Sequence, residues 1–218
     1  MKKRYLALTL PLLCLPLLAG CNSRTDYFNY ASEVKEDIFC AETDRYTLSV
    51  SCIAREYPYI ADGICCPKSN VVEISLTTTE RGAYEVYLTG DTPIGGEMTF
   101  RTYAGDYFFS QSVEGFMKDK ITLRIVKGDE SEEVIATSVK NDKTLVPRDA
   151  LARAVEAERD TIEAMTGKDG FAGEFYVRLL RRDTNYYYVG IINRQGETLS
   201  LLLDSETGEV LARRKNNA

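Results

Sequence analysis

Four cysteines in the body of the chain are the residues with the widest choice of chemistry. Cys40, Cys52, Cys65 and Cys66 form an even set, which favours two disulfides in an oxidising compartment. A Cys65–Cys66 bridge would close a strained ring, so we expect Cys40 and Cys52 each to pair with one of the two. Four free thiols are the alternative. Zinc is disfavoured because the adjacent pair lacks the usual ligand spacing and the chain has no histidine.

The absence of histidine also limits catalysis. It removes the Ser-His-Asp and Cys-His mechanisms and every histidine-ligated metal site. Hydrolysis by two carboxylates stays open, yet no pair stands out among acids that fall mostly beside turns. The acidic run 129–133 lacks the central glycine of a calcium loop and is interpreted as a hairpin tip. We therefore expect no enzyme, no catalytic residue, no metal site and no cofactor.

Tyrosines gather at several places, most densely at Tyr186–Tyr188. Neighbouring side chains of a strand alternate between faces, so at least one of these rings must point away from the core. An outward Tyr187 would be a candidate contact for a glycan or a peptide. Use of the ring as packing material within the fold is the alternative.

The N-terminus reads as a targeting signal. Lys2, Lys3 and Arg4 precede an apolar stretch of about 14 residues, which is shorter than the roughly 20 needed to span a bilayer. The stretch ends in Leu18-Ala19-Gly20-Cys21, which resembles the lipobox of bacterial lipoproteins. That resemblance implies cleavage after residue 20 and a lipid on Cys21, and so an extracytoplasmic protein anchored to the cell membrane.

Removal of residues 1–20 makes the net charge more negative than the −6 of the full chain, because the segment carries only basic charges. The net negative charge of the remaining chain argues against nucleic acid as a partner. The membrane, reached through the N-terminal lipid, and a protein or peptide are the partners that we expect.

The segment 21–35 is polar with scattered aromatic residues and is interpreted as a tether. From 36 to 140 the pattern is β throughout: short runs of alternating polarity, seven or eight in number, are separated by glycine-rich turns. Such spacing predicts an antiparallel β-sandwich that is similar in architecture to immunoglobulin-type domains.

The pattern changes at residues 147–214. Pro147 suits the first turn of a helix, and Leu151, Val155, Ile162 and Met165 share one face of a predicted helix at 148–165. Predicted strands follow at 174–181, 186–193, 198–204 and 210–213. A turn joins the last two, and its Gly208 is expected to need a positive φ. The unit is therefore α+β: one helix followed by an antiparallel sheet.

The end of this unit carries the motif Asp-x-x-Thr-Gly-Glu-Val-Leu at 204–211. With the preceding helix and paired strands, it resembles the PepSY domain of secreted peptidase propeptides and bacterial envelope proteins. The resemblance covers about a third of the chain and implies an interaction or regulatory module, for example one that restrains a secreted protease. It brings no catalytic residue.

Two functions follow as hypotheses. The first is a non-enzymatic lipoprotein that binds a protein or a peptide, for which an exposed edge strand on the C-terminal sheet would be the structural sign. The alternative is a structural or adhesive envelope module that binds wall glycan, for which an aromatic groove would be the sign.

Overall fold

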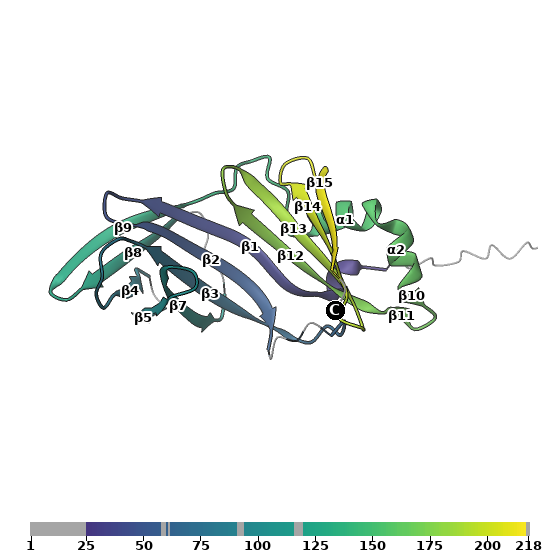
Figure 1. Cartoon of the computed structure of the whole chain (residues 1–218), viewed down its shortest axis with the longest axis horizontal. Coiled ribbons are helices and arrows are strands. Elements are labelled where there is room, and N and C mark those ends of the chain that lie inside the picture. The colour runs from purple at the N-terminus through teal and green to yellow at the C-terminus, as the bar shows by residue number, and fades with distance from the viewer. Residues whose placement is uncertain (1–24, 58–59, 61, 91–93, 116–119, 217–218) are drawn as a thin grey trace, which may run out of the picture.

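A computed structural model describes residues 25–57, 60, 62–90, 94–115 and 120–216, and the chain it shows is mainly β (Figure 1). The predicted signal and the lipobox, at 1–21, lie outside these residues. The elements in chain order are η1 (Tyr27–Tyr30), β1 (Ala31–Glu42), β2 (Thr47–Glu56), β3 (Lys68–Thr77), β4 (Glu85–Leu88), β5 (Ile94–Glu97), β6 (Thr99–Arg101), β7 (Asp106–Val113), β8 (Lys120–Lys127), β9 (Glu130–Ser138), α1 (Pro147–Ala157), α2 (Arg159–Ala164), β10 (Thr166–Gly167), β11 (Gly170–Phe171), β12 (Gly173–Arg181), β13 (Asn185–Asn193), β14 (Thr198–Asp204) and β15 (Val210–Asn216).

All but two of these strands belong to one sheet of 13 strands. Its main path runs β15-β14-β13-β12-β1-β2-β3-β7-β6, and a branch runs from β1 through β9, β8 and β4 to β5. Neighbours are antiparallel except for the parallel pair β1–β12. The predicted mainly β, antiparallel character is confirmed. Strands 36–140 curve towards a barrel, because both the path and the branch leave from β1 and bend around one core.

The long strand β1 connects the two halves of the sheet (Figure 1). Its first residues pair with β12, and Phe39 and Cys40 pair with β9. An irregularity between Lys35 and Asp37 changes which residues face each side. Ile38 and Phe39 are consecutive and both buried, and because successive side chains of a strand point to opposite faces they belong to different hydrophobic cores.

The predicted tether at 21–35 is wrong for its second part. Residues 27–30 form η1, and β1 begins at Ala31. The aromatic residues of this part are anchors: the Tyr27 ring lies 5.6 Å and the Tyr30 ring 5.3 Å from the Phe171 ring, both edge-on. Contacts of this kind stabilise beyond the area they bury, which holds the segment against the C-terminal core.

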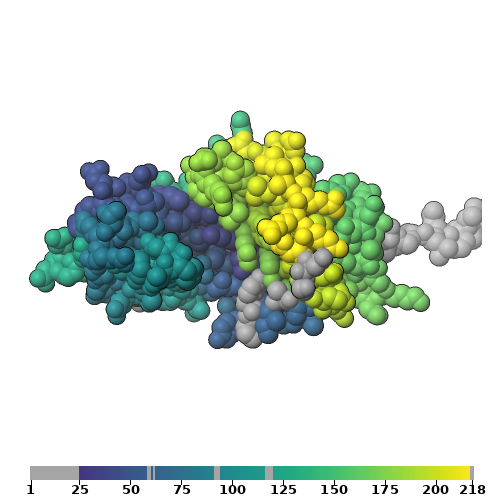
Figure 2. Space-filling view, in the orientation of Figure 1, coloured from purple at the N-terminus to yellow at the C-terminus, as the bar shows by residue number. Residues whose placement is uncertain are grey.

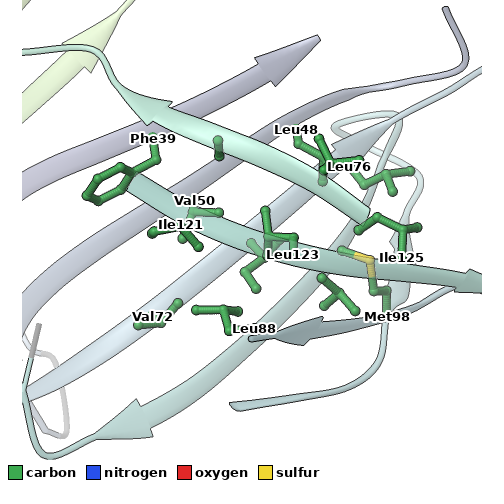
Figure 3. Close-up of a cluster of buried hydrophobic side chains, with 14 of the residues drawn as sticks. Phe39, Leu48, Val50, Val72, Leu76, Leu88, Met98, Ile121, Leu123 and Ile125 are labelled. Carbon is green, nitrogen blue, oxygen red and sulfur yellow. The ribbon is translucent and has the colours of Figure 1, made fainter. Parts of the chain in front are cut away.

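The near-barrel half encloses an apolar core (Figure 3). Leu48, Val50 and Leu123 are fully buried, and side chains of β1, β2, β3 and β8 point toward one another. Alternation explains the set, since every second residue of the central parts of β2 and β3 enters this core: Leu48, Val50, Cys52, Val72, Ile74 and Leu76. This half is therefore held by packing of aliphatic side chains.

In the C-terminal half, helices cover one face of the sheet β12–β15 (Figure 1). The predicted helix at 148–165 is two helices, α1 and α2, which meet at Glu158 with φ −115° and ψ 30°. The break keeps Leu151 and Ile162 both buried, as predicted, while Val155 and Met165 are half-buried. No helix in the described residues has the length and apolar character that a bilayer crossing needs.

Candidate functional site

The last strand, β15, forms an open edge of the sheet. It pairs with β14 and with no other strand among the described residues. Five consecutive residues, 212–216, are exposed, and Leu211 is 49% exposed although it is a large aliphatic residue. An edge strand presents unpaired backbone N–H and C=O groups, which can pair with another extended chain.

The turn before β15 fixes the direction of the strand. Asp204 accepts hydrogen bonds from the backbone N–H groups of Glu206 (3.0 Å) and Thr207 (2.8 Å), which keeps the pKa of its carboxyl below the usual value. Gly208 has φ +74°, as predicted, and a Cβ there would lie 2.5 Å from Cγ of Arg153. The PepSY-like motif residues therefore act locally as a tight turn that delivers the edge strand.

The edge is basic although the chain as a whole is acidic. Arg213, Arg214 and Lys215 are consecutive and exposed on β15. Arg213 forms an ion pair with the buried Glu158 at the junction of the helices. Within the described residues Arg214 and Lys215 form no ion pair, so two positive charges beside the open edge are available to a ligand.

A groove of about 540 Å³ lies on the helix side of this edge, and we call it the helix-side groove. Ala164 and Met165 line it from the end of α2, and Ile191 and Leu199 from the sheet. Arg194 and Lys215 add positive charge to its lining. Leu199 pairs directly with Lys215, so both side chains lie on the helix-covered face of the sheet.

A second groove of about 310 Å³ lies on the opposite face, and we call it the outer groove. It is lined by Tyr188, Ser200, Leu202, Ala212 and Arg214, which the strand register places on one face. The hydroxyl groups of Tyr188 and Ser200 are 2.9 Å apart and share a hydrogen bond. The edge is thus flanked by a groove on each face of the sheet, and Figure 2 shows the C-terminal strands (yellow) at the surface.

Tyr187 does not point outwards, so that prediction is wrong. Its side chain is fully buried in the helix-covered core, and its hydroxyl donates a 2.7 Å hydrogen bond to the Leu145 carbonyl. Burial raises the pKa of the Tyr187 hydroxyl. Alternation itself holds, since Tyr186 and Tyr188 lie on the other face. The sequence did not show that α1 and α2 cover the face that carries Tyr187, Val189 and Ile191.

The predicted disulfides are absent: no disulfide joins Cys40, Cys52, Cys65 and Cys66 in the part of the chain that the structure describes. Cys40 pairs with Ser49 and Cys52 lies on β2, whereas the Cys66 N–H donates to the Glu56 carboxylate at the far end of β2 (2.7 Å). The strand rise of about 3.3 Å per residue puts four to seven residues' length, roughly 13 to 23 Å, between these points. A disulfide needs Cα atoms within about 7 Å of each other.

One buried acid was missed by the sequence analysis. Glu174 is fully buried, and neither of its carboxyl oxygens has a hydrogen bond of ordinary geometry. Loss of hydration raises the pKa of Glu174 to about 7, and nearby Glu56 and Asp62 add to the effect, while Ser32 and the Gly63 backbone favour the charged form. Alternation put Glu174 on the polar face, but contact of Gly63 with Asn193 and Arg194 shows that this part of the face is covered.

Glu56 and Glu174 are the carboxyl groups that bear on the hydrolase hypothesis. Both are buried, at 3% and 0% exposure, and neither lines one of the grooves described above. The described residues contain no cluster of Cys, Asp and Glu side chains with the geometry to hold a metal ion.

The placement of the aromatic residues gives the glycan hypothesis little support. Tyr57 and Tyr103 are each 86% exposed, but one follows β2 and the other lies in the turn between β6 and β7. Tyr176 is nearly buried, with the Arg178 guanidinium 4.7 Å from its ring centre, and Arg178 also bonds Glu33 at 2.6 Å. The Tyr176 ring and the charges of Arg178 and Glu33 belong to the packing between β1 and β12.

Comparisons with known proteins give no match. No protein-family model fits the chain, and no curated protein and no solved structure is significantly similar to it.

Proposed function

We propose that this chain is an extracytoplasmic lipoprotein, anchored through Cys21, that binds an extended peptide segment without catalysing a reaction. The observation that carries the proposal is the open edge of β15, with exposed backbone, consecutive basic side chains and a groove on each side. Addition of a strand to an exposed sheet edge is a common mode of peptide recognition, in which the backbone supplies affinity and the flanking grooves supply specificity.

The finer assignments belong to the same proposal. Residues 147–214 would form a PepSY-like unit, and residues 36–140 an immunoglobulin-like sandwich. The motif at 204–211 supports the first, because it builds the turn that delivers β15. A secreted protease is then the partner that the resemblance suggests, with its extended segment lying along β15.

The test of strand addition is binding of a pooled library of ten-residue peptides to the full chain. We expect binding that is lost when the same peptides are N-methylated at alternate residues, because methylation removes the donors that pair with the edge. Hydrogen exchange should slow at residues 210–216 and not in β8, which lies between two other strands. Binding that tolerates N-methylation would contradict the proposal.

The anchor has its own test. Growth of a bacterial host with an alkyne-labelled fatty acid should label the wild-type chain and leave Cys21→Ser unlabelled. Cys66→Ser, which removes an exposed thiol from the body of the chain, is the matched control and should stay labelled. Equal labelling of both variants would show that Cys21 is not the lipid site.

The glycan alternative predicts a different result. If the chain bound wall polymer through Tyr57 or Tyr103, it would sediment with purified peptidoglycan, and Tyr103→Ala would reduce the sedimented fraction. We expect no such dependence on Tyr103.

A further inference from the structure

We propose that the segment bound at β15 carries consecutive acidic side chains, which place carboxylates on both faces of the sheet. The inference rests on the proposed function and adds the chemical class of the partner. It follows from three consecutive basic residues on β15 and from the strand register that distributes them over the two faces. The two grooves contribute in the same way, because each is lined by basic side chains.

The three basic residues of β15 lie on both faces of the sheet. Lys215 pairs directly with Leu199, which is buried in the helix-covered core, so Lys215 lies on the helix-covered face. Arg213, two residues earlier, lies on the same face, and its ion pair with Glu158 at the junction of the helices agrees with this placement. Arg214 lies between them in the chain and therefore points to the other face, where it lines the outer groove.

Most of the positive charge at this edge is available to a ligand. Arg214 and Lys215 form no ion pair within the described residues, and neither does the exposed Arg194, which lines the helix-side groove with Lys215. Glu197 is the acidic residue in the lining of that groove, and its carboxylate accepts a 2.8 Å hydrogen bond from the Asn193 side chain. No acidic residue lines the outer groove in the part of the chain that the structure describes. The lining of each groove therefore carries a net positive charge.

The geometry of an added strand converts this distribution of charge into a requirement on the partner's sequence. Each residue of the added strand lies opposite a residue of β15, with Cβ atoms about 4.5 to 5.5 Å apart, where opposite charges attract and like charges repel. Because successive side chains alternate between the faces, a run of adjacent acids meets Arg214 on one face and Lys215 on the other. Acids at every second position would all lie on one face and would meet the basic residues of that face alone.

The probes are fluorescent ten-residue Ser/Thr peptides with three glutamates in the centre, either consecutive or at every second position. Matched peptides carry three consecutive glutamines or three consecutive lysines. We expect the consecutive-Glu peptide to bind the full chain about tenfold more tightly than the Gln peptide and about threefold more tightly than the spaced-Glu peptide. The Lys peptide should bind most weakly. The advantage of the consecutive-Glu peptide should shrink as the salt concentration rises, because exposed charges are screened.

Two charge reversals test the two faces separately. Arg214→Glu and Lys215→Glu should each weaken binding of the consecutive-Glu peptide about fivefold and strengthen binding of the Lys peptide. Arg182 is exposed in the turn between β12 and β13 and lies outside both grooves, so Arg182→Glu is the matched control and should leave the affinity unchanged. Circular dichroism of each variant establishes that a loss of binding is not a loss of fold.

The outcomes separate the inference from the proposed function. If neither these probes nor the pooled library binds, strand addition at β15 is wrong and the inference falls with it. The same conclusion holds if an N-methylated consecutive-Glu peptide binds as well as the unmethylated one, because charge alone then attracts it. If peptides bind in a way that N-methylation abolishes, three results overturn the inference alone: equal affinity of the Glu and Gln peptides, equal affinity of consecutive and spaced glutamates, or no effect of either charge reversal.

Discussion

The two halves of the molecule are both built from β-strands, but they differ in how those strands are paired. In the near-barrel half, β1, β2, β3, β7 and the branch through β9 and β8 bend around one core, so most of their backbone groups are paired. In the C-terminal half, β12–β15 stay open: helices cover one face, grooves flank the last strands, and β15 ends the sheet. The near-barrel half ends in the short strands β5 and β6, of four and three residues, whereas the C-terminal half ends in the seven-residue strand β15.

This difference is the reason that we propose peptide binding in the C-terminal half. Sheets that close leave few edges, whereas an open edge invites pairing and is commonly protected by charged side chains. The basic residues of β15 serve that protection, since two copies of this edge would repel each other. An acidic partner meets no such barrier, so the same charges discourage self-association and favour one class of ligand.

The largest expected effect tests whether the halves are separate at all. Ile38→Ala and Phe39→Ala remove neighbouring side chains of β1 that lie in different cores. Each should lower the free energy of unfolding by about 2 to 5 kcal/mol. Because β1 is shared, we expect one cooperative transition in thermal circular dichroism for both variants. Hydrogen exchange that accelerates only in β8 for Phe39→Ala, and only in β14 for Ile38→Ala, would show two independent domains instead.

The next largest expected effect is a pH dependence of the free energy of unfolding. It distinguishes the two halves, because the buried acid Glu174 lies in the C-terminal half. Its folded-state pKa, about 7, is above the ordinary 4.5, so the folded chain keeps a proton that the unfolded chain releases. This contribution to stability is full below about pH 4.5 and is lost as the pH rises towards and through 7. Urea denaturation should therefore give a free energy of unfolding about 2 kcal/mol lower at pH 8 than at pH 5.

Glu174→Gln is the matched variant for that measurement. The amide cannot ionise, so the fall in stability between pH 5 and pH 8 should largely disappear. Glu163→Gln, an exposed acid on α2, is the control and should keep the wild-type pH dependence. An unchanged slope in Glu174→Gln would mean that another group titrates.

A smaller effect separates packing from binding at the tyrosine cluster. Tyr187→Phe removes the hydrogen bond to the Leu145 carbonyl and should lower the free energy of unfolding by about 1 kcal/mol. Peptide affinity should not change, because this ring is buried under the helices. Tyr188→Phe is expected to act in the opposite sense, with little change in stability and weaker binding of a peptide at β15, because Tyr188 lines the outer groove. Equal behaviour of the two variants would contradict this assignment.

The smallest expected effect concerns the cysteines. Because no disulfide joins Cys40, Cys52, Cys65 and Cys66, a reducing agent should shift the unfolding midpoint by no more than the error of the measurement. Alkylation of the unfolded, non-reduced chain, followed by peptide mass spectrometry, should find Cys40, Cys52, Cys65 and Cys66 all modified. Recovery of a disulfide-linked pair of peptides would overturn this description.

What the sequence determined by itself is local. Alternation located most strands, the missing histidine limited the chemistry, and the Asp204–Gly208 turn was predictable with its positive φ, because each depends on residues close together in the chain. Tertiary structure decided which face of each strand is covered, which is why Tyr187 and Glu174 were misjudged. It also decided that β1 joins both halves and that β15 has no outer neighbour, since pairing between distant segments leaves no mark in the local pattern of either.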